Sequence, residues 1–182
     1  MKLICMMAIA GVASFAGAQT FSEVESNNTL GTANDIGTFD IPGGSVLISG
    51  ILGDADVDWY AFTLDNVASL SVFAVFSDDA DADGVMQLVT AGGDVIDFDD
   101  DSGIGFMPAI QATDLAAGTY YIGLSGFGDA DSTSVDTDVL LNGDGHTENF
   151  GYKISVGFSI VPSPSTAALL GLGGLVGLRR RR

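Results

Sequence analysis

The chain has 182 residues, with 24 acidic side chains, six basic side chains and one histidine, which gives a formal net charge of −18 at pH 7. All 24 acids but only one base, Lys153, lie between residues 19 and 161, so that stretch carries a formal charge of −23. Such a surface repels phosphate groups, which excludes nucleic acids and anionic lipids as partners and favours divalent cations. The only cysteine, Cys5, lies outside the stretch. A metal ion is therefore the candidate for additional stabilisation there.

The first 18 residues have the three parts of a secretory signal in order. Lys2 supplies a basic start, residues 3–15 form an apolar run, and Ala16, Gly17 and Ala18 form a small-residue cleavage site. We therefore expect a signal peptide at 1–18 that is removed after Ala18, and an exported protein.

The C-terminal end has a different layout. Pro162, Ser163 and Pro164 precede an uncharged run at 165–178, and the chain ends with an arginine cluster at 179–182. An uncharged helix of that length spans about 21 Å, against about 30 Å for the hydrocarbon core of a bilayer, so it crosses only marginally. The arginines would hold the C-terminus on the cytoplasmic side and leave the preceding chain outside.

This layout resembles the PEP-CTERM sorting tail of exopolysaccharide-producing Gram-negative bacteria, although Ser163 stands where the family has a glutamate. The resemblance implies that residues 162–182 are a sorting tail with a short transmembrane helix. It also implies processing by an exosortase-like enzyme and export to the cell surface. Contact with the membrane is then expected only through this tail.

Between these two ends, the chain is long enough for one domain with a sizeable core. Alternating apolar residues predict short strands separated by Gly- and Asp-rich turns. Tyr60, Phe62 and Leu64 fall on one face of a strand, whereas Phe73 and Val75 suggest a strand that is buried on both sides. The pattern indicates an all-β fold, an antiparallel β-sandwich. The predicted strands are 45–51, 59–64, 69–76, 85–89, 95–98, 119–125 and 152–160.

Oxygen-bearing side chains alternate at two places in the sequence. Asp54, Asp56 and Asp58 come directly before the 59–64 strand, and three like charges so close together repel one another unless a cation or solvent relieves them. They therefore form either a calcium-binding edge or a hydrated loop. Near the N-terminus, alternating positions carry hard oxygen ligands that suit Ca²⁺ in an extended segment, namely Glu23, Glu25 and Asn27.

Five short motifs in order resemble one known family. They are Glu23-x-Glu25-x-Asn27-Asn28 followed by Ala33, Gly50-x-Leu52 with Asp56-x-Asp58-Trp59-Tyr60-x-Phe62, Gly92-x-x-Val95-x-x-Phe98-x-Asp100, Leu115-x-x-Gly118-Thr119-Tyr120-Tyr121-Ile122 and Tyr152-x-Ile154-x-Val156. Across residues 23–156 the chain is similar to the bacterial pre-peptidase C-terminal (PPC) domain, a jelly-roll-like β-sandwich appended to secreted peptidases and surface proteins. The chain departs from the family in lacking a peptidase domain and in an insertion at 129–148.

The resemblance implies a PPC-like domain at 19–161 that is not an enzyme. In collagen-binding members of the family, calcium is held between the N-terminal Glu-x-Glu-x-Asn segment and the Asp-rich turn that precedes the strand beginning at Trp59. Carried over position by position, the resemblance implies a Ca²⁺ cofactor with ligands among Glu23, Glu25, Asn27, Asn28, Asp56 and Asp58.

A further acidic pattern, at 79–84, has acids at positions 1, 3 and 5 and the glycine at position 6 of an EF-hand loop. Thr90 occupies position 12, where the loop needs a glutamate, and a strand follows in place of a helix. This leaves a weak calcium site and a hydrated turn as alternatives. The same alternatives apply to the acidic edge formed by Asp97, Asp99, Asp100 and Asp101.

Catalysis is the minority hypothesis. Ser125 misses the Gly-x-Ser-x-Gly elbow at its last glycine, and nothing ties the single histidine, His146, to it, which disfavours a Ser-His-Asp triad. A glycosidase needs a sugar cleft lined by aromatic residues, and the single tryptophan, Trp59, fits core packing better. Tyr121 points away from the core side, either on a ligand-binding face or as an ordinary β-former on an exposed face.

The leading hypothesis is a non-catalytic, calcium-stabilised β-sandwich at the cell surface that binds extracellular matrix polysaccharide or protein. The alternative is a purely structural component of an acidic coat or biofilm matrix, in which the carboxylates provide solubility and cross-linking through cations. A secreted hydrolase ranks third.

Overall fold

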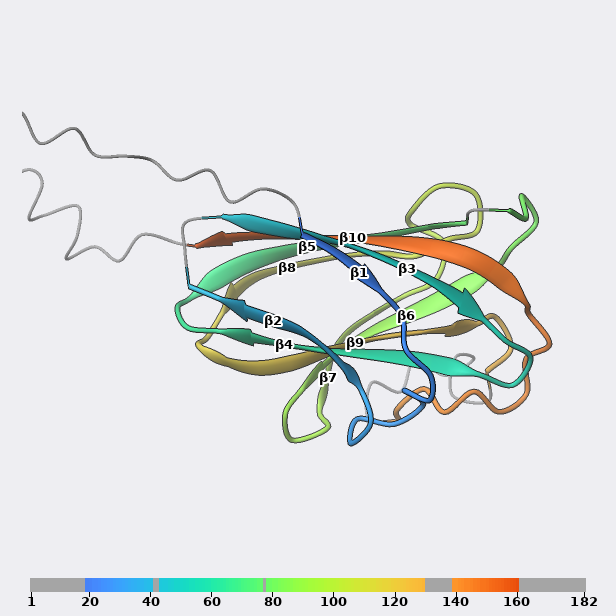
Figure 1. The fold of residues 1–182 in the computed structure, drawn as a ribbon, viewed down its shortest axis with the longest axis horizontal. Coiled ribbons are helices and arrows are strands. Elements are labelled where there is room, and N and C mark those ends of the chain that lie inside the picture. The colour runs from blue at the N-terminus through green and yellow to red at the C-terminus, as the bar shows by residue number, and fades with distance from the viewer. Residues whose placement is uncertain (1–18, 41–42, 77, 130–138, 161–182) are drawn as a thin grey trace, which may run out of the picture.

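The computed structural model describes residues 19–40, 43–76, 78–129 and 139–160. These residues form ten strands in two five-stranded sheets, which stack as the upper and lower layers of a sandwich (Figure 1). The described part of the chain contains no helix, and so none that could cross a membrane. The predicted signal peptide at 1–18 and the predicted sorting tail at 162–182 lie outside the described residues.

The first sheet combines strands from the whole length of the described chain. Its order is β1 (Gln19–Ser22), β3 (Gly44–Leu52), β10 (Phe150–Ile160), β5 (Ala68–Phe76) and β8 (Ala109–Leu115). The second sheet has the order β2 (Asn34–Phe39), β4 (Val57–Leu64), β9 (Gly118–Gly126), β6 (Gly84–Thr90) and β7 (Val95–Asp99).

Both sheets are mixed, which corrects one part of the prediction. The sandwich itself is confirmed, but β1 pairs with β3 and β2 pairs with β4 in parallel, while the remaining pairs are antiparallel. The first four strands alternate between the two sheets, so the chain crosses to the other layer between β1 and β3, and again between β2 and β4. Because each return follows a crossover instead of a hairpin, the paired strands run in the same direction.

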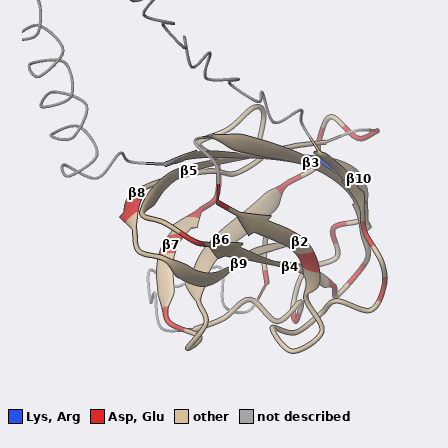
Figure 2. Cartoon of the chain, turned by 60° about the vertical axis from the view of Figure 1, so that its left-hand side comes forward, with Lys and Arg blue, Asp and Glu red and all other residues tan. Residues whose placement is uncertain are grey.

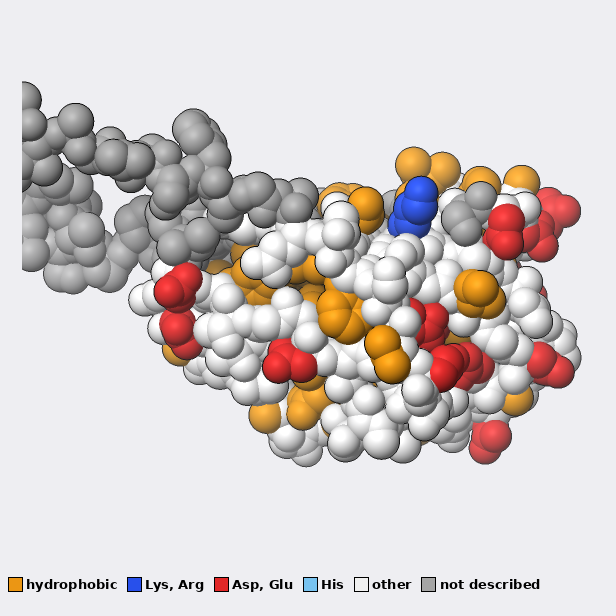
Figure 3. All heavy atoms as spheres, viewed as in Figure 1, with side chains coloured by type: hydrophobic (Ala, Val, Ile, Leu, Met, Phe, Trp, Pro, Cys, Tyr) orange, Lys and Arg blue, Asp and Glu red, His pale blue; other side chains and the backbone are white. Residues whose placement is uncertain are grey.

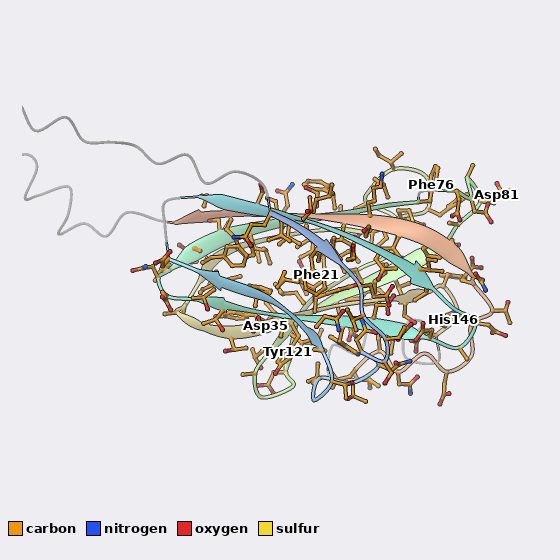
Figure 4. All side chains as sticks on the ribbon, viewed as in Figure 1. Phe21, Asp35, Phe76, Asp81, Tyr121 and His146 are labelled. Atoms are coloured by element: carbon orange, nitrogen blue, oxygen red, sulfur yellow. The ribbon has the colours of Figure 1, made fainter. Side chains whose placement is uncertain are left out.

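The main core lies between the two sheets and follows the predicted alternation. Tyr60, Phe62 and Leu64 of β4 are all at most 1% exposed, and they face the inward side chains of the first sheet. The rings of Phe39 and Phe158 stack with centroids 3.8 Å apart and tie the two layers together at one end. Phe21 of β1 points into the space between the layers (Figure 4) and meets the Tyr60 ring edge-on at 6.3 Å.

A second, smaller hydrophobic cluster lies on the outer face of the second sheet. Trp59 is 1% exposed there and packs with Val85, Val89 and Leu141. Gln87 fixes the segment that covers this face, since its Nε2 donates to Val139 O at 2.8 Å and its Oε1 accepts from Leu141 N at 3.0 Å. Residues 139–148 therefore cover an apolar face, and we call them the 139–148 segment.

This covering changes the interpretation of Tyr121. The side chain does lie on the outer side of β9 (Figure 4), as the alternation predicts, but it is only half-exposed and packs against the second cluster. Tyr121 therefore contributes to the packing of the second cluster as well as to the surface of this face.

The first sheet has an open outer face, which corrects the prediction for β5. Phe73 is 42% exposed and Val75 is half-buried, so β5 is buried on one side only. Phe73 is aligned with Ser155 of β10 and Ala109 of β8, two small residues that leave its ring uncovered. Lys153, the only Lys or Arg among the described residues, lies on the same face in β10, while acidic residues occupy loops and strand ends around the molecule (Figure 2).

Candidate metal centre

Three carboxylates converge at the edge of the sandwich. Glu23 directly follows β1 of the first sheet, Glu25 lies two residues further on, and Asp58 belongs to β4 of the second sheet. Each offers a carboxylate oxygen, and these oxygens lie within 4.8 Å of one another. We call Glu23, Glu25 and Asp58 the carboxylate cluster. The face that carries β1 shows carboxylates gathered to the right of centre, near the end of that strand (Figure 3).

Two members of the carboxylate cluster each accept a hydrogen bond at one of their two oxygens. Glu23 Oε2 accepts from Ile51 N at 2.8 Å, and Asp58 Oδ2 accepts from the Tyr152 hydroxyl at 2.6 Å. The other oxygens, Glu23 Oε1 and Asp58 Oδ1, are buried and have no hydrogen-bond partner among the described residues. Two ionised carboxylates have no hydrogen to share, so a proton or a cation is needed between them.

Asn27 adds a second kind of unsatisfied group. Its side chain is 0% exposed, and neither Oδ1 nor Nδ2 has a hydrogen-bond partner in the described part of the chain. Its backbone carbonyl accepts from Trp59 N at 3.1 Å, which fixes Asn27 beside the residue that follows Asp58. Leaving a buried amide unpaired costs about 1–3 kcal/mol, and of its two polar atoms only Oδ1 could bind a cation, because Nδ2 is a donor.

Asp56 and Asn28 are joined to each other. The Asn28 side-chain amide donates to Asp56 Oδ1, which also accepts from Val57 N at 2.9 Å, while Asp56 Oδ2 accepts from Gly53 N at 3.2 Å. Asp56 shares a solvent-open groove of about 610 Å³ with two members of the carboxylate cluster. The groove is lined by Ser22, Glu23, Glu25, Ser49, Gly50, Ile51, Gly53 and Asp56.

The electrostatics of the groove reflect crowded negative charge. Burial, with the contact to Glu23 as the next cause, raises the pKa of the Asp58 carboxyl to about 9. Burial and then the Asp56 and Glu23 charges raise the pKa of Glu25. Without a cation, a proton therefore remains on Asp58 at neutral pH, which relieves the repulsion that a divalent ion would otherwise relieve.

Two tyrosines close the inner side of the site. The Tyr152 hydroxyl, which donates to Asp58, also forms a hydrogen bond with the Tyr60 hydroxyl. Burial is the main cause that raises the pKa of both phenols, so both keep their protons. A protonated Tyr152 orients Asp58 and directs its partnerless oxygen toward the other acids.

The donor set fits Ca²⁺. The unsatisfied atoms that could bind a cation are carboxylate and amide oxygens, the hard ligands that calcium takes in sets of six to eight. A structural zinc site is excluded for the carboxylate cluster, because zinc prefers nitrogen and sulfur ligands and this cluster contains neither. Of the six predicted ligand positions, the structure brings Glu23, Glu25 and Asp58 together in the cluster. Asn27 is joined to Trp59 through its backbone carbonyl, and Asn28 is bonded to Asp56 in the groove wall.

The half EF-hand motif does not assemble as a loop. Asp79 and Asp81 are exposed, and Asp81 N donates to Asp79 Oδ1 at 3.0 Å in an ordinary turn. Asp83 instead lies with Asp100 and Asp101, which we call the second acidic cluster. Burial, followed by the charges of Asp100, Asp101 and Glu148, raises the pKa of Asp83 to about 6.

The candidate triad is absent from the hydrogen bonds between described residues. Ser125 Oγ lies 2.7 Å from Asp129 Oδ2 and 3.0 Å from the carbonyl of Asp56. His146 Nε2 lies 2.7 Å from that same carbonyl, and no hydrogen bond joins His146 to Ser125 in this part of the chain. Both side chains are buried, at 3% and 0% exposure respectively, so neither is presented to a substrate.

Sequence reasoning missed Gly50, Tyr60 and Tyr152 as parts of the site. The two tyrosines follow the alternation of core residues, and the sequence alone does not reveal which core hydroxyls meet a carboxylate. Gly50 does leave a signal, because a glycine inside an apolar strand often marks a close approach of other groups.

One family model matches part of the chain. Residues 56–126 match the family described as the bacterial pre-peptidase C-terminal domain, PPC. No curated protein matches the chain.

Solved structures with a similar arrangement share little sequence with this chain. The pre-peptidase C-terminal domain of a Bacillus anthracis collagenase is 15% identical with a TM-score of 0.47, covering 68% of this chain and 93% of that one. PliG from Aeromonas hydrophila, a periplasmic inhibitor of g-type lysozyme, is 15% identical with a TM-score of 0.45, covering 69% and 99%. PliG from Salmonella Typhimurium is 18% identical with a TM-score of 0.40, covering 70% and 100%.

Proposed function

We propose that this chain is an exported, non-catalytic β-sandwich module that Ca²⁺ stabilises and that binds extracellular matrix material, with polysaccharide as the favoured ligand class. The observation that carries the proposal is the convergence of the Glu23, Glu25 and Asp58 carboxylates, in which Glu23 Oε1 and Asp58 Oδ1 have no hydrogen-bond partner among the described residues. These atoms come from different sheets and loops, so one ion bound there would join the N-terminal segment to β4.

Calcium would supply positive charge where the described residues offer almost none. Lys153 is the only Lys or Arg among the described residues, and it lies on the open outer face of the first sheet. Binding to the folded state alone stabilises a protein by RT ln(1 + [L]/Kd), which is about 2.7 kcal/mol at 100 times Kd. We therefore propose that calcium takes the place of disulfides in this exported domain.

The groove suggests the class of ligand. Glu23, Glu25 and Asp58 contribute three carboxylates around the position of one divalent ion, and Asp56 lines the same groove as Glu23 and Glu25, so a loaded site stays net negative. An anionic ligand would be repelled, whereas a neutral polysaccharide presents only hydroxyl groups. The groove wall offers matching polar groups at Ser22 and Ser49 and an exposed apolar side chain at Ile51.

A melting experiment tests the calcium proposal. Saturating Ca²⁺ should raise the Tm of residues 19–161 by about 5–10 °C over the value in a chelator. Asp58→Asn should abolish the rise. Asp54→Asn is the matched control, because Asp54 is an exposed acid of the same turn that lies outside the carboxylate cluster, and it should leave the rise intact. An equal rise in both variants would contradict the proposed site.

A retention experiment tests the ligand proposal. The protein is passed over immobilised neutral glucans and over immobilised uronate polymers, in calcium and in a chelator. We expect calcium-dependent retention on a neutral glucan, with loss in Glu25→Gln. Retention on the uronate polymer alone, or retention that the chelator does not change, would contradict the groove as the ligand site.

A further inference from the structure

Asp56 sits at the end of a turn with an uncommon backbone. Ala55, the residue before it, has φ of 53°, in the left-handed region that non-glycine residues seldom adopt. Such a conformation persists only where the surrounding structure fixes it. Asp56 directly follows Ala55 in the chain. The backbone conformation of Ala55 therefore sets the direction in which the Asp56 carboxylate points.

His146 contacts the Asp56 backbone directly. Its Nε2 lies 2.7 Å from Asp56 O and 3.1 Å from Asp56 N, and the ring is 3% exposed. His146 comes from the 139–148 segment, 90 residues further along the chain, at the right-hand end of the molecule (Figure 4). The imidazole therefore holds the backbone of Asp56 while the carboxylate of the same residue lines the groove.

Ser125 provides a second tether to the same carbonyl. Its Oγ lies 3.0 Å from Asp56 O and 2.7 Å from Asp129 Oδ2. The same Asp129 oxygen accepts from Gly143 N at 2.9 Å and from Asn142 N at 3.3 Å. Asp129 thus connects the end of β9 to the segment that carries His146.

The backbone of the 139–148 segment also packs closely against the turn at Ala55 and Asp56. Gly143 has φ of 83°, and a β-carbon at this position would lie 2.9 Å from Ala55 O and 2.9 Å from Asp56 C. Only a glycine allows both the backbone conformation and the close approach. Contacts of three kinds, from an imidazole, a hydroxyl and a backbone, therefore converge on Ala55 and Asp56.

We infer that His146 and Ser125 are positioning residues for the metal centre, and that the 139–148 segment acts as a clamp that holds Asp56 toward Glu23 and Glu25. The inference rests on the proposed function, since it concerns the affinity of that Ca²⁺ site. It gives the insertion at 129–148 a role, because Asp129, Gly143 and His146 all belong to it. Outer-shell partners of metal ligands typically change metal affinity 10–100-fold when they are removed.

Terbium binding separates positioning from general support of the fold. Tb³⁺ replaces Ca²⁺ at oxygen sites, and nearby phenol rings sensitise its luminescence, here including Tyr152, whose hydroxyl lies 2.6 Å from Asp58. Lifetimes in H₂O and D₂O count the waters on the bound ion. The full domain is studied as wild type, His146→Ala, His146→Gln and Thr147→Ala, where Thr147 is the exposed neighbour in the same segment.

We expect His146→Ala to weaken Tb³⁺ and Ca²⁺ binding at least tenfold and to add about one water to the bound Tb³⁺, as Asp56 withdraws. His146→Gln should restore most of the affinity, because its amide can reach the same backbone groups, and Thr147→Ala should change neither quantity. Ser125→Ala, a smaller change, should act in the same direction as His146→Ala and serves where the latter does not fold.

Two results would overturn the inference, and they differ from each other. If the wild type binds the ion while His146→Ala and Ser125→Ala keep its affinity and water count and only lower the Tm in a chelator, the two residues support the fold and not the site. If the wild type itself binds neither Tb³⁺ nor Ca²⁺, the proposed function fails, and the inference fails with it.

Discussion

Gly50 lies directly against the hydroxyl of Tyr152, in a space that has no room for a side chain at position 50. The two residues are partners across the β3–β10 ladder, and a β-carbon on residue 50 would overlap both the Tyr152 hydroxyl and the Glu23 carboxylate. Tyr152 in turn donates to Asp58. The carboxylate cluster can therefore form only because residue 50 lacks a side chain.

Gly50→Ala should consequently damage the site and the fold together. Overpacking by one methyl group costs about 1–3 kcal/mol in a packed interior, and here the added atom also displaces Glu23 or Tyr152. Urea denaturation in calcium and in a chelator measures both effects. We expect a lower free energy of unfolding in the chelator and no further stabilisation by calcium.

Gly157→Ala is the matched control for that substitution. Gly157 lies in β10 of the same sheet, where a β-carbon would meet only Ser71 O at an ordinary 3.8 Å. Its free energy of unfolding should stay within about 0.5 kcal/mol of the wild type, and its response to calcium should be unchanged. Equal behaviour of the two variants would mean that Gly50 does not shape the site.

The raised pKa of Asp58 predicts how stability depends on pH when no metal is bound. The folded chain holds this proton up to a pKa of about 9, whereas an unfolded aspartate loses it near 3.9. Between these values the folded state binds more protons than the unfolded state, so the free energy of unfolding falls as pH rises. The window from pH 7 to 9 leaves Asp83 out of the measurement, because its pKa of about 6 means that it has already titrated.

Denaturation at pH 7, 8 and 9 in a chelator measures this slope. We expect a falling free energy of unfolding for the wild type and a flat one for Asp58→Asn. Saturating calcium should also flatten the wild-type slope, because the bound ion replaces the proton. A wild type whose stability rises between pH 7 and 9 in the chelator would show that Asp58 is already ionised.

The sequence was most informative where one face of a strand is buried. The alternation at Tyr60, Phe62 and Leu64 predicted both the strand and its inward face, because period-two burial leaves a direct trace in residue type. β1 and β2 left no such trace. They are short, polar edge strands, and parallel pairing across a crossover has no local turn signal.

β8 was missed for a similar reason. Only Ile110 and Leu115 are buried within it, and its polar residues alternate too weakly to indicate a strand. The six candidate ligands stay a prediction that rests on resemblance to a family, and the atoms that contact them could not be predicted at all. Ile51 N, the Tyr152 hydroxyl and His146 act through tertiary contacts across 28 to 94 positions of sequence, which no local pattern records.

Phe73 and Val72 show that residue type alone does not predict whether an apolar side chain is buried. A pair of substitutions tests this difference. Neighbours on β5, they are 42% and 0% exposed. Phe73→Thr should change the free energy of unfolding by no more than about 0.5 kcal/mol, because threonine suits an open sheet face. Val72→Thr should cost about 1–3 kcal/mol, because it buries a hydroxyl in the main core. Similar losses for both would mean that another surface covers Phe73.

The second acidic cluster predicts a stabilising substitution. Burial and the charges of Asp100, Asp101 and Glu148 raise the pKa of Asp83 to about 6, so at pH 7 the folded state carries an ionised Asp83 in unfavourable surroundings. The free energy of unfolding should therefore fall as pH rises from about 4 to 6, where the folded state loses this proton. Asp83→Asn removes the charge and should raise the Tm at pH 7 in a chelator.

The pH comparison identifies the cause of that rise. At pH 4 Asp83 is protonated in the folded state, so Asp83→Asn should then change the Tm little. Asp81→Asn, an exposed acid two residues earlier, is the matched control and should have little effect at either pH. Sodium chloride at high concentration should shrink the gain at pH 7, since it screens repulsion by Asp101 and Glu148, but the part due to burial should remain. An equal gain at pH 4 and pH 7 would assign the effect to packing and not to charge.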